Sequence, residues 1–198
     1  DLSPERLGVD LATYGAQKIQ GPKGVGVLFK HSAVTLEPLM RGGQQERGVR
    51  QGTENVSGIV GAAKAFELAA KTRKSRTKQV ERVRDFMVKL LEKEIPRAEI
   101  NGGFKHRIAN NINISIPGAD GDYLAVLMDT EGVAVSARSV CVANGEGSRT
   151  IESLGKGKEH ALGSLRFSCA PWVTKEDARR AVNALKKSLE VIDQAVEK

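Results

Sequence analysis

The segment 111–116 alternates polar and apolar residues without a break, and this period of two is that of a strand with one buried face. The segment 164–169 has the same period, so both segments are predicted to be strands. Because its side chain falls on the apolar face, Cys169 is expected to belong to the core. The apolar face of 164–169 is formed by Leu165, Phe167 and Cys169, and the polar face by Ser164, Arg166 and Ser168.

Segments whose apolar residues recur with the period of a helix lie before, between and after these strands. The apolar pattern predicts one helix over 54–71, with Thr53 as its N-cap, and a second over 79–94 that stops near Pro96. Short strands are expected at 9–11, 24–29 and 133–135, and a helix at 122–130. The final helix is expected to begin after a capping box formed by Thr174 and Asp177. Together these patterns predict a mixture of helices and strands with a domain boundary near residue 72.

The chain is basic, with 31 Lys and Arg against 24 Asp and Glu. Positive charge gathers between Lys71 and Arg84, where only Glu81 interrupts it. A solvated helix face is the simplest interpretation, and a docking surface for an acidic partner is an alternative. The stretch argues against nucleic acid as a partner, because it has almost no aromatic residues on which bases could stack.

Composition also argues against several classes of protein. No apolar run reaches the ~20 residues that span a bilayer, so we expect no membrane contact. Two cysteines are too few for a disulfide scaffold, which favours free thiols in the reducing cytoplasm. The three histidines lie far apart and form no zinc-binding pattern, so no metal is expected.

Three residues could carry chemistry. Lys18 lies in a Gly-Pro-rich turn; partial desolvation would make its amine nucleophilic, although spacing alone favours a surface lysine. Cys141 lies among small polar residues near Arg138, which would stabilise a thiolate, so functional and structural roles both stay open. Arg166 could bind a carboxylate at two points or form an ordinary ion pair.

Four motifs follow one another along the chain. They are Gln17 to Gly26 (QKIQGPKGVG), Gly42 to Asn55 (GGQQERGVRQGTEN), Ser136 to Cys141 (SARSVC) and Ser164 to Ser168 (SLRFS). In this order they resemble the motifs of the cysteine desulfurases, which are pyridoxal-phosphate enzymes of the class V aminotransferase group. The resemblance implies an α/β fold, that of a fold-type I pyridoxal-phosphate enzyme, and extends over most of the chain.

The resemblance also implies roles for individual residues. Lys18 would hold pyridoxal phosphate as a Schiff base, and Gln17, where the family usually has histidine, would contact the cofactor. Thr53 would contact the cofactor phosphate of the neighbouring subunit in a homodimer. Cys141 would take sulfur from the substrate, and Arg166 would anchor the substrate carboxylate.

The implied reaction converts L-cysteine to L-alanine and leaves a persulfide on Cys141. The sulfur would pass to an acceptor protein, either an iron–sulfur scaffold or a tRNA-thiolation enzyme. Members of the family are about twice as long, so this chain is expected to be the C-terminal half, with 1–72 ending the large cofactor domain and 73–198 forming a small α+β domain. The N-terminal half would come from one of two sources. Either this chain, which begins at Asp1, is a fragment of a longer protein that contains the N-terminal half, or a separate complementing chain supplies it.

Other functions stay open at this stage. The chain could belong to another pyridoxal-phosphate enzyme of the group, an aminotransferase or a selenocysteine lyase. It could also be a non-catalytic sulfur-relay subunit, which would use Cys141 but have no need of Lys18. A basic nucleic-acid module is the third alternative.

Overall fold

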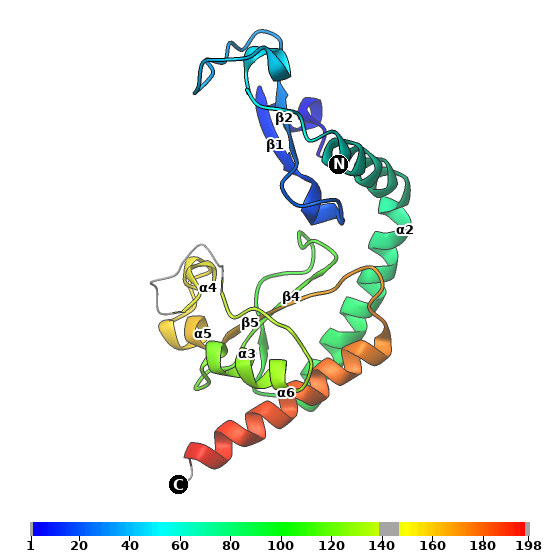
Figure 1. The fold of residues 1–198 in the computed structure, drawn as a ribbon. Helices are drawn as coiled ribbons and strands as arrows, with labels where there is room; N and C mark the ends of the chain where they lie inside the picture. Colours follow the sequence, from blue (N-terminus) through cyan, green and yellow to red (C-terminus); the bar gives the residue numbers. More distant parts are fainter. Residues whose placement is uncertain (1, 139–146, 197–198) are drawn as a thin grey trace. The chain divides into compact units, whose positions relative to one another are not determined.

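The structure, a computed structural model, describes residues 2–138 and 147–196. The chain divides into two compact units, Asp1–Arg73 and Lys74–Lys198 (Figure 1). The sequence places a domain boundary near residue 72, and the assignment of the two parts to a large and a small domain stays a prediction. Within the described residues, no helix is both long and apolar enough to cross a membrane.

The first unit contains a β-hairpin. Strand β1 (Leu11–Gly15) pairs antiparallel with β2 (Gly26–Lys30), so that Gly15 lies opposite Gly26 at the closed end. The other elements of the unit are α1 (Pro4–Leu7), η1 (Ala16–Ile19), η2 (Gln45–Gly48) and the beginning of α2 (Val56–Glu94). The connection between the two strands begins with η1, which contains Lys18.

Two glycines of α2 allow this connection to pack closely against the helix. A Cβ atom on Gly58 would lie 2.5 Å from a methyl carbon of Val25, and one on Gly61 would lie 3.3 Å from Pro22 Cγ. A side chain at Gly58 would therefore push the connection away from the helix. The close approach fixes the turn that carries Lys18 within its unit.

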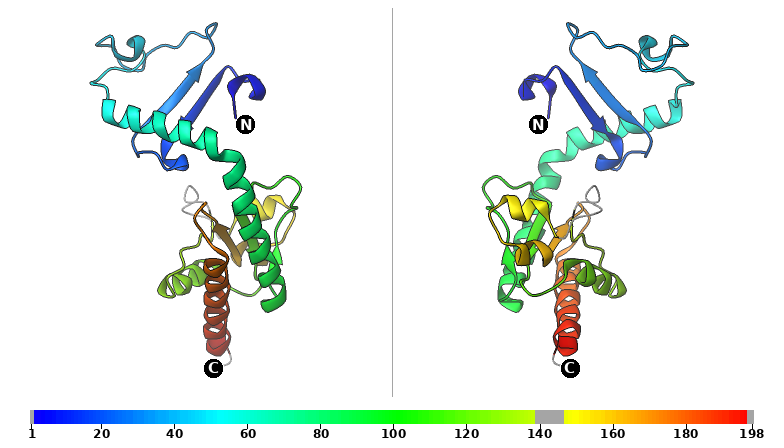
Figure 2. Two further views of the ribbon diagram at one scale, coloured as in Figure 1. Left: turned by 90° about the vertical axis from the view of Figure 1, so that its right-hand side faces the viewer. Right: turned by 90° about the vertical axis from the view of Figure 1, so that its left-hand side faces the viewer.

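The second unit is a three-stranded antiparallel sheet, in the order β3-β4-β5, flanked by helices (Figures 1 and 2). Its strands are β3 (Glu99–Ile100), β4 (Asn111–Ser115) and β5 (Ser164–Ser168). Its helices, besides the end of α2, are α3 (Gly121–Thr130), α4 (Arg149–Ser153), α5 (Lys158–Leu162) and α6 (Lys175–Val196).

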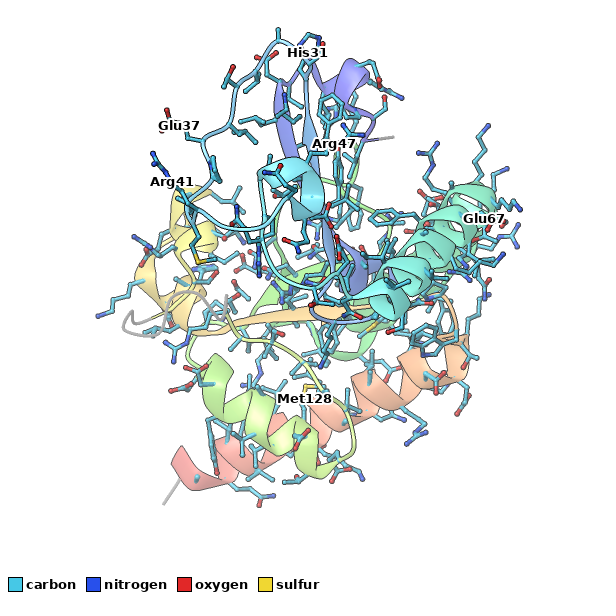
Figure 3. All side chains as sticks on the ribbon, turned by 45° about the horizontal axis from the view of Figure 1, so that its top comes forward. His31, Glu37, Arg41, Arg47, Glu67 and Met128 are labelled. Carbon is cyan, nitrogen blue, oxygen red and sulfur yellow. The ribbon has the colours of Figure 1, made fainter. Side chains whose placement is uncertain are left out.

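The core of this unit lies on the apolar face of the sheet. Ile112, Ile114 and Leu165 are buried there together with side chains of α2, α3 and α6. The helices contribute Met87, Leu91, Leu124, Met128 (labelled in Figure 3), Val182 and Leu185 among others. The sheet thus turns its polar face to the opposite side, where the candidate site lies.

Most expectations for the second unit are confirmed. The strands expected at 111–116 and 164–169 are β4 and β5, the helix expected at 122–130 is α3, and the final helix is α6. Cys169 is a core residue, 7% exposed, and burial raises the pKa of its thiol. The capping box is present, because the Thr174 N–H donates to Asp177 Oδ2 over 2.9 Å.

The expectation of two helices between 54 and 94 is wrong. Helix α2 runs unbroken from Val56 to Glu94, because the charged and polar stretch 72–78 contains neither Gly nor Pro and so nothing that stops a helix. Thr53 is not its N-cap. Asn55 Oδ1 instead accepts a hydrogen bond from the Gly58 N–H over 3.0 Å.

Two short strands also differ from expectation. The strand expected at 9–11 starts later, as β1, because Gly8 ends α1 in the left-handed conformation with φ 63°. The stretch 133–135 is not a strand. It follows the tight turn at Gly132, with φ 76°, and within the described residues 133–138 the pairing with the sheet is limited to Ser136.

Candidate active site

A pocket of about 270 Å³ opens on the polar face of the sheet, with its whole lining in the second unit. Helix α4 closes one side, and the segment before residue 139 closes another. The lining residues are Asn101, Gly102, Arg107, Asn111, Asn113, Ala137, Arg138, Ser148, Thr150, Ile151, Leu154 and Arg166. Three are arginines and none is acidic, so among the described residues the pocket favours an anionic ligand.

Arg166 extends from the polar face of β5 into this pocket. Its backbone exchanges two hydrogen bonds with Ser136, with N···O distances of 2.7 and 3.2 Å, which attach Ser136 to the sheet beside Arg166. The Nε atom is buried, and none of the described residues accepts a hydrogen bond from it. No described acidic residue forms an ion pair with Arg166, so its planar fork is available for a carboxylate.

An amide network lies next to Arg166, and the sequence analysis missed it. Asn101 Nδ2 donates to Asn113 Oδ1 over 2.7 Å and to Ser115 Oγ over 2.8 Å. Ser115 Oγ in turn donates to the His160 carbonyl over 2.8 Å. The signal was present in the alternation of 111–116, which puts Asn113 and Ser115 on the face of Arg166.

The two other arginines of the pocket have partners. Arg107 donates to Asn111 Oδ1 over 3.0 Å and to the Asn101 carbonyl, and it stacks on Phe104 with 5.3 Å between its guanidinium carbon and the ring centroid. Desolvation, and then the charge of Arg84, lower the pKa of Arg107. Arg138 forms an ion pair with Asp122 over 2.7 Å. These contacts hold the walls of the pocket in place.

Cys141, the predicted sulfur acceptor, lies outside the described residues. The described chain leads to it through Arg138, which lines the same pocket as Arg166. The structure therefore brings together the segment that leads to Cys141 and the predicted carboxylate anchor.

The remaining predicted site residues belong to the first unit. Lys18 and Gln17 lie in η1, both exposed, and none of the described residues forms a hydrogen bond or ion pair with the Lys18 amine. The Gln17 amide folds back over Gly15, so a Cβ atom there would lie 2.7 Å from Gln17 Oε1. Thr53 is also exposed. The partial desolvation that a nucleophilic lysine needs is not supplied by this unit.

The basic stretch between Lys71 and Arg84 is only partly a solvated face. Glu67, labelled in Figure 3, pairs with Lys64 and Lys71, whose hydrogen bonds lower its pKa. Arg84 departs from the expectation, because it is 8% exposed and lies 2.8 Å from Asp85 Oδ1. No cluster of three or more metal-ligating side chains occurs in the part of the chain that the structure describes.

Comparison with known proteins gives consistent matches. The family described as Aminotransferase class-V matches residues 1–180. Cysteine desulfurase IscS of Dictyoglomus turgidum is 37% identical over 190 residues, which are 96% of this chain and 48% of that protein. Cysteine desulfurase IscS of Methanosarcina thermophila is 36% identical over 198 residues, which are 100% of this chain and 47% of that protein. The chain thus spans about half the length of these curated relatives.

Solved structures agree with these matches. A NifS-like protein superposes with a TM-score of 0.81 at 34% identity, over 96% of this chain and 48% of that one. A NifS-like protein from Rickettsia africae gives a TM-score of 0.84 at 28% identity, over 94% of this chain and 49% of that one. The α/β fold expected from the sequence is confirmed by these neighbours.

Proposed function

Because the chain belongs to the class V aminotransferase family, we propose that it is the C-terminal half of a cysteine desulfurase. Its relatives at 36–37% identity are named cysteine desulfurases, and its fold is that of about half of a fold-type I pyridoxal-phosphate enzyme. The observation that carries the proposal is the buried Nε of Arg166, which has no partner among the described residues, in a pocket whose described lining contains no acidic residue, beside the segment that leads to Cys141.

Enzymes of this family depend on pyridoxal phosphate, and the residues of this chain fit that cofactor. Lys18 offers an exposed primary amine with no hydrogen bond or ion pair among the described residues, as a bond to an aldehyde requires. The Gln17 amide and the Thr53 hydroxyl would supply polar contacts to the cofactor. When bound, the cofactor would accept the electron pair that stays on the α carbon of the substrate when the α proton leaves.

The protein side chains perform the other steps. Arg166 binds the carboxylate of L-cysteine and orients the amino acid, and Lys18 takes up the α proton at Nζ. The Cys141 thiolate then attacks the substrate sulfur. A sulfur–sulfur bond forms as the carbon–sulfur bond breaks; the bonding electrons stay with carbon, which takes up protons to give L-alanine.

The same proposal covers partners and location. We propose a homodimer in which Thr53 reaches the cofactor phosphate of the neighbouring subunit, and an N-terminal half supplied by the same protein or by a complementing chain. The persulfide sulfur goes to an iron–sulfur scaffold or a tRNA-thiolation enzyme. A free thiolate at position 141 persists in a reducing compartment, so we place the enzyme in the cytoplasm.

The test is to weigh the peptide that contains Cys141. The complete reading frame with pyridoxal phosphate and L-cysteine should add a mass of about 32 Da, one sulfur atom, to that peptide. Lys18→Ala and Cys141→Ala should each abolish the gain. Bound cofactor without any gain would instead indicate an aminotransferase. A persulfide that forms without Lys18, from a separate sulfur donor, would indicate a relay subunit.

A further inference from the structure

Asn113 is the direct neighbour of Arg166 across the sheet. In the antiparallel pairing of β4 and β5 the two residues lie opposite each other. Opposite residues place their side chains on the same face, with Cβ atoms about 5 Å apart. Both residues line the pocket on the polar face. The pocket therefore holds an amide group next to the guanidinium group.

The orientation of this amide is fixed by Asn101. Asn113 Oδ1 accepts a hydrogen bond from Asn101 Nδ2 over 2.7 Å, and Asn101 is 2% exposed and also bound to Ser115. Because the oxygen faces Asn101, the NH₂ group of Asn113 points to the other side. Among the described residues, none accepts a hydrogen bond from this NH₂ group. It remains a donor without an acceptor.

The buried Nε–H of Arg166, which has no acceptor among the described residues, thus lies opposite the NH₂ group of Asn113, which is not buried and can donate to a ligand in the pocket. A carboxylate has two oxygens that can accept about four hydrogen bonds, so it can bind the guanidinium and still accept from an amide. We propose that Asn113 is a second binding residue for the substrate carboxylate, and that Asn101 is the positioning residue that turns its NH₂ group toward the ligand. This inference rests on the proposed function for the identity of the substrate.

The first test measures carboxylate binding without catalysis. The complete reading frame, isotope-labelled and prepared without pyridoxal phosphate, is titrated with propionate and with its neutral isostere propionamide, while NMR follows the Asn113 side-chain amide and the Arg166 Nε–H. Propionate should shift both resonances, and propionamide should shift them only at much higher concentration. Asn113→Asp keeps the oxygen that Asn101 needs but replaces the donor with negative charge, so propionate binding should weaken about tenfold or more.

Control variants separate binding from folding. Asn110→Asp adds the same charge at an exposed side chain outside the pocket lining and should change propionate affinity less than about twofold. Asn113→Ala gives a second test if Asn113→Asp fails to fold. Asn101→Ala should lower the preference for propionate over propionamide, whereas a merely structural effect would weaken both ligands equally.

The second test uses the complete reading frame with pyridoxal phosphate. Asn113→Ala should raise KM for L-cysteine about tenfold and leave kcat nearly unchanged, because it removes uniform substrate binding. An unmoved Asn113 resonance, or unchanged affinity in both Asn113 variants, would overturn the inference. Propionate binding through Asn113 in a protein that forms no persulfide would reject the proposed function and leave the carboxylate site standing.

Discussion

At the scale of single residues, the Asn101 amide links the end of β3 to β4, because its NH₂ group donates to both Asn113 Oδ1 and Ser115 Oγ. Alternation alone put Asn113 and Arg166 on polar faces of their strands. It could not identify Asn101, because that residue reaches Asn113 only through the pairing of β3 with β4, in a register set by tertiary packing. Arg84 was misjudged for the same reason, since its burial depends on a distant loop that carries Phe104.

Asn101→Ala should destabilise the chain by about 1–3 kcal/mol, because it leaves Asn113 Oδ1 and Ser115 Oγ without the donor that now serves both. Urea unfolding followed by circular dichroism measures the change. Asn110→Ala, at an exposed side chain in the loop before β4, is the matched control and should have little effect. Equal stability of the two variants would show that the network contributes nothing.

At the scale of secondary-structure elements, hydrophobic periods located the long helices but not the junction between them. Two separate apolar patterns, over 54–71 and 79–94, suggested two helices, yet the stretch between them contains no Gly or Pro to interrupt the backbone. The close contact between α2 and the hairpin connection was also invisible, because a glycine in a helical pattern does not reveal what packs against it.

Gly58→Ala should therefore loosen the first unit, even though alanine favours a helix. The added methyl would lie 2.5 Å from Val25 and 2.6 Å from Asn55 Nδ2, and such overpacking typically costs about 1–3 kcal/mol. Hydrogen exchange of the β1 and β2 amides measures the loss as faster exchange. Gly103→Ala, where a Cβ atom meets nothing within 4 Å, is the control. Slower exchange in Gly58→Ala would contradict the packing argument.

The start of α6 should respond to acid through Asp177. Hydrogen bonds from the Thr174 N–H and hydroxyl lower the pKa of Asp177 below its ordinary value. Ionised Asp177 therefore stabilises the fold above that ordinary value, and the stabilisation is lost as pH falls through the lowered pKa.

The corresponding measurement is Tm against pH, from neutral pH to strongly acidic pH. Asp177→Asn should lower Tm at neutral pH and flatten its decline in acid, and Thr174→Ala should cost about 1 kcal/mol through the lost cap. Asp129→Asn, at an exposed position near the end of α3, should leave the profile unchanged. If the curves of Tm against pH for Asp177→Asn and the unsubstituted chain were parallel, Asp177 would have no part in the acid sensitivity of the fold.

At the scale of the whole molecule, the four motifs were sufficient to identify the family, because each combines several residue types in a fixed order. Hydrophobic periodicity and composition alone were not sufficient to identify it. From its local sequence alone, Lys18 was predicted to be a surface lysine, and it is exposed within its unit. Its proposed role depends on groups that desolvate the amine, which local sequence does not encode.

This dependence predicts that residues 1–198 by themselves bind pyridoxal phosphate weakly or not at all. The turn that carries Lys18 leaves its amine in water, and the chain spans about half the length of its relatives, so contacts from the other half would have to enclose the cofactor. Absorbance after gel filtration should show no stoichiometric cofactor on this chain, whereas the complete reading frame should retain it and lose it with Lys18→Ala. A one-to-one cofactor band on the chain alone would mean that the two units described here suffice to desolvate Lys18.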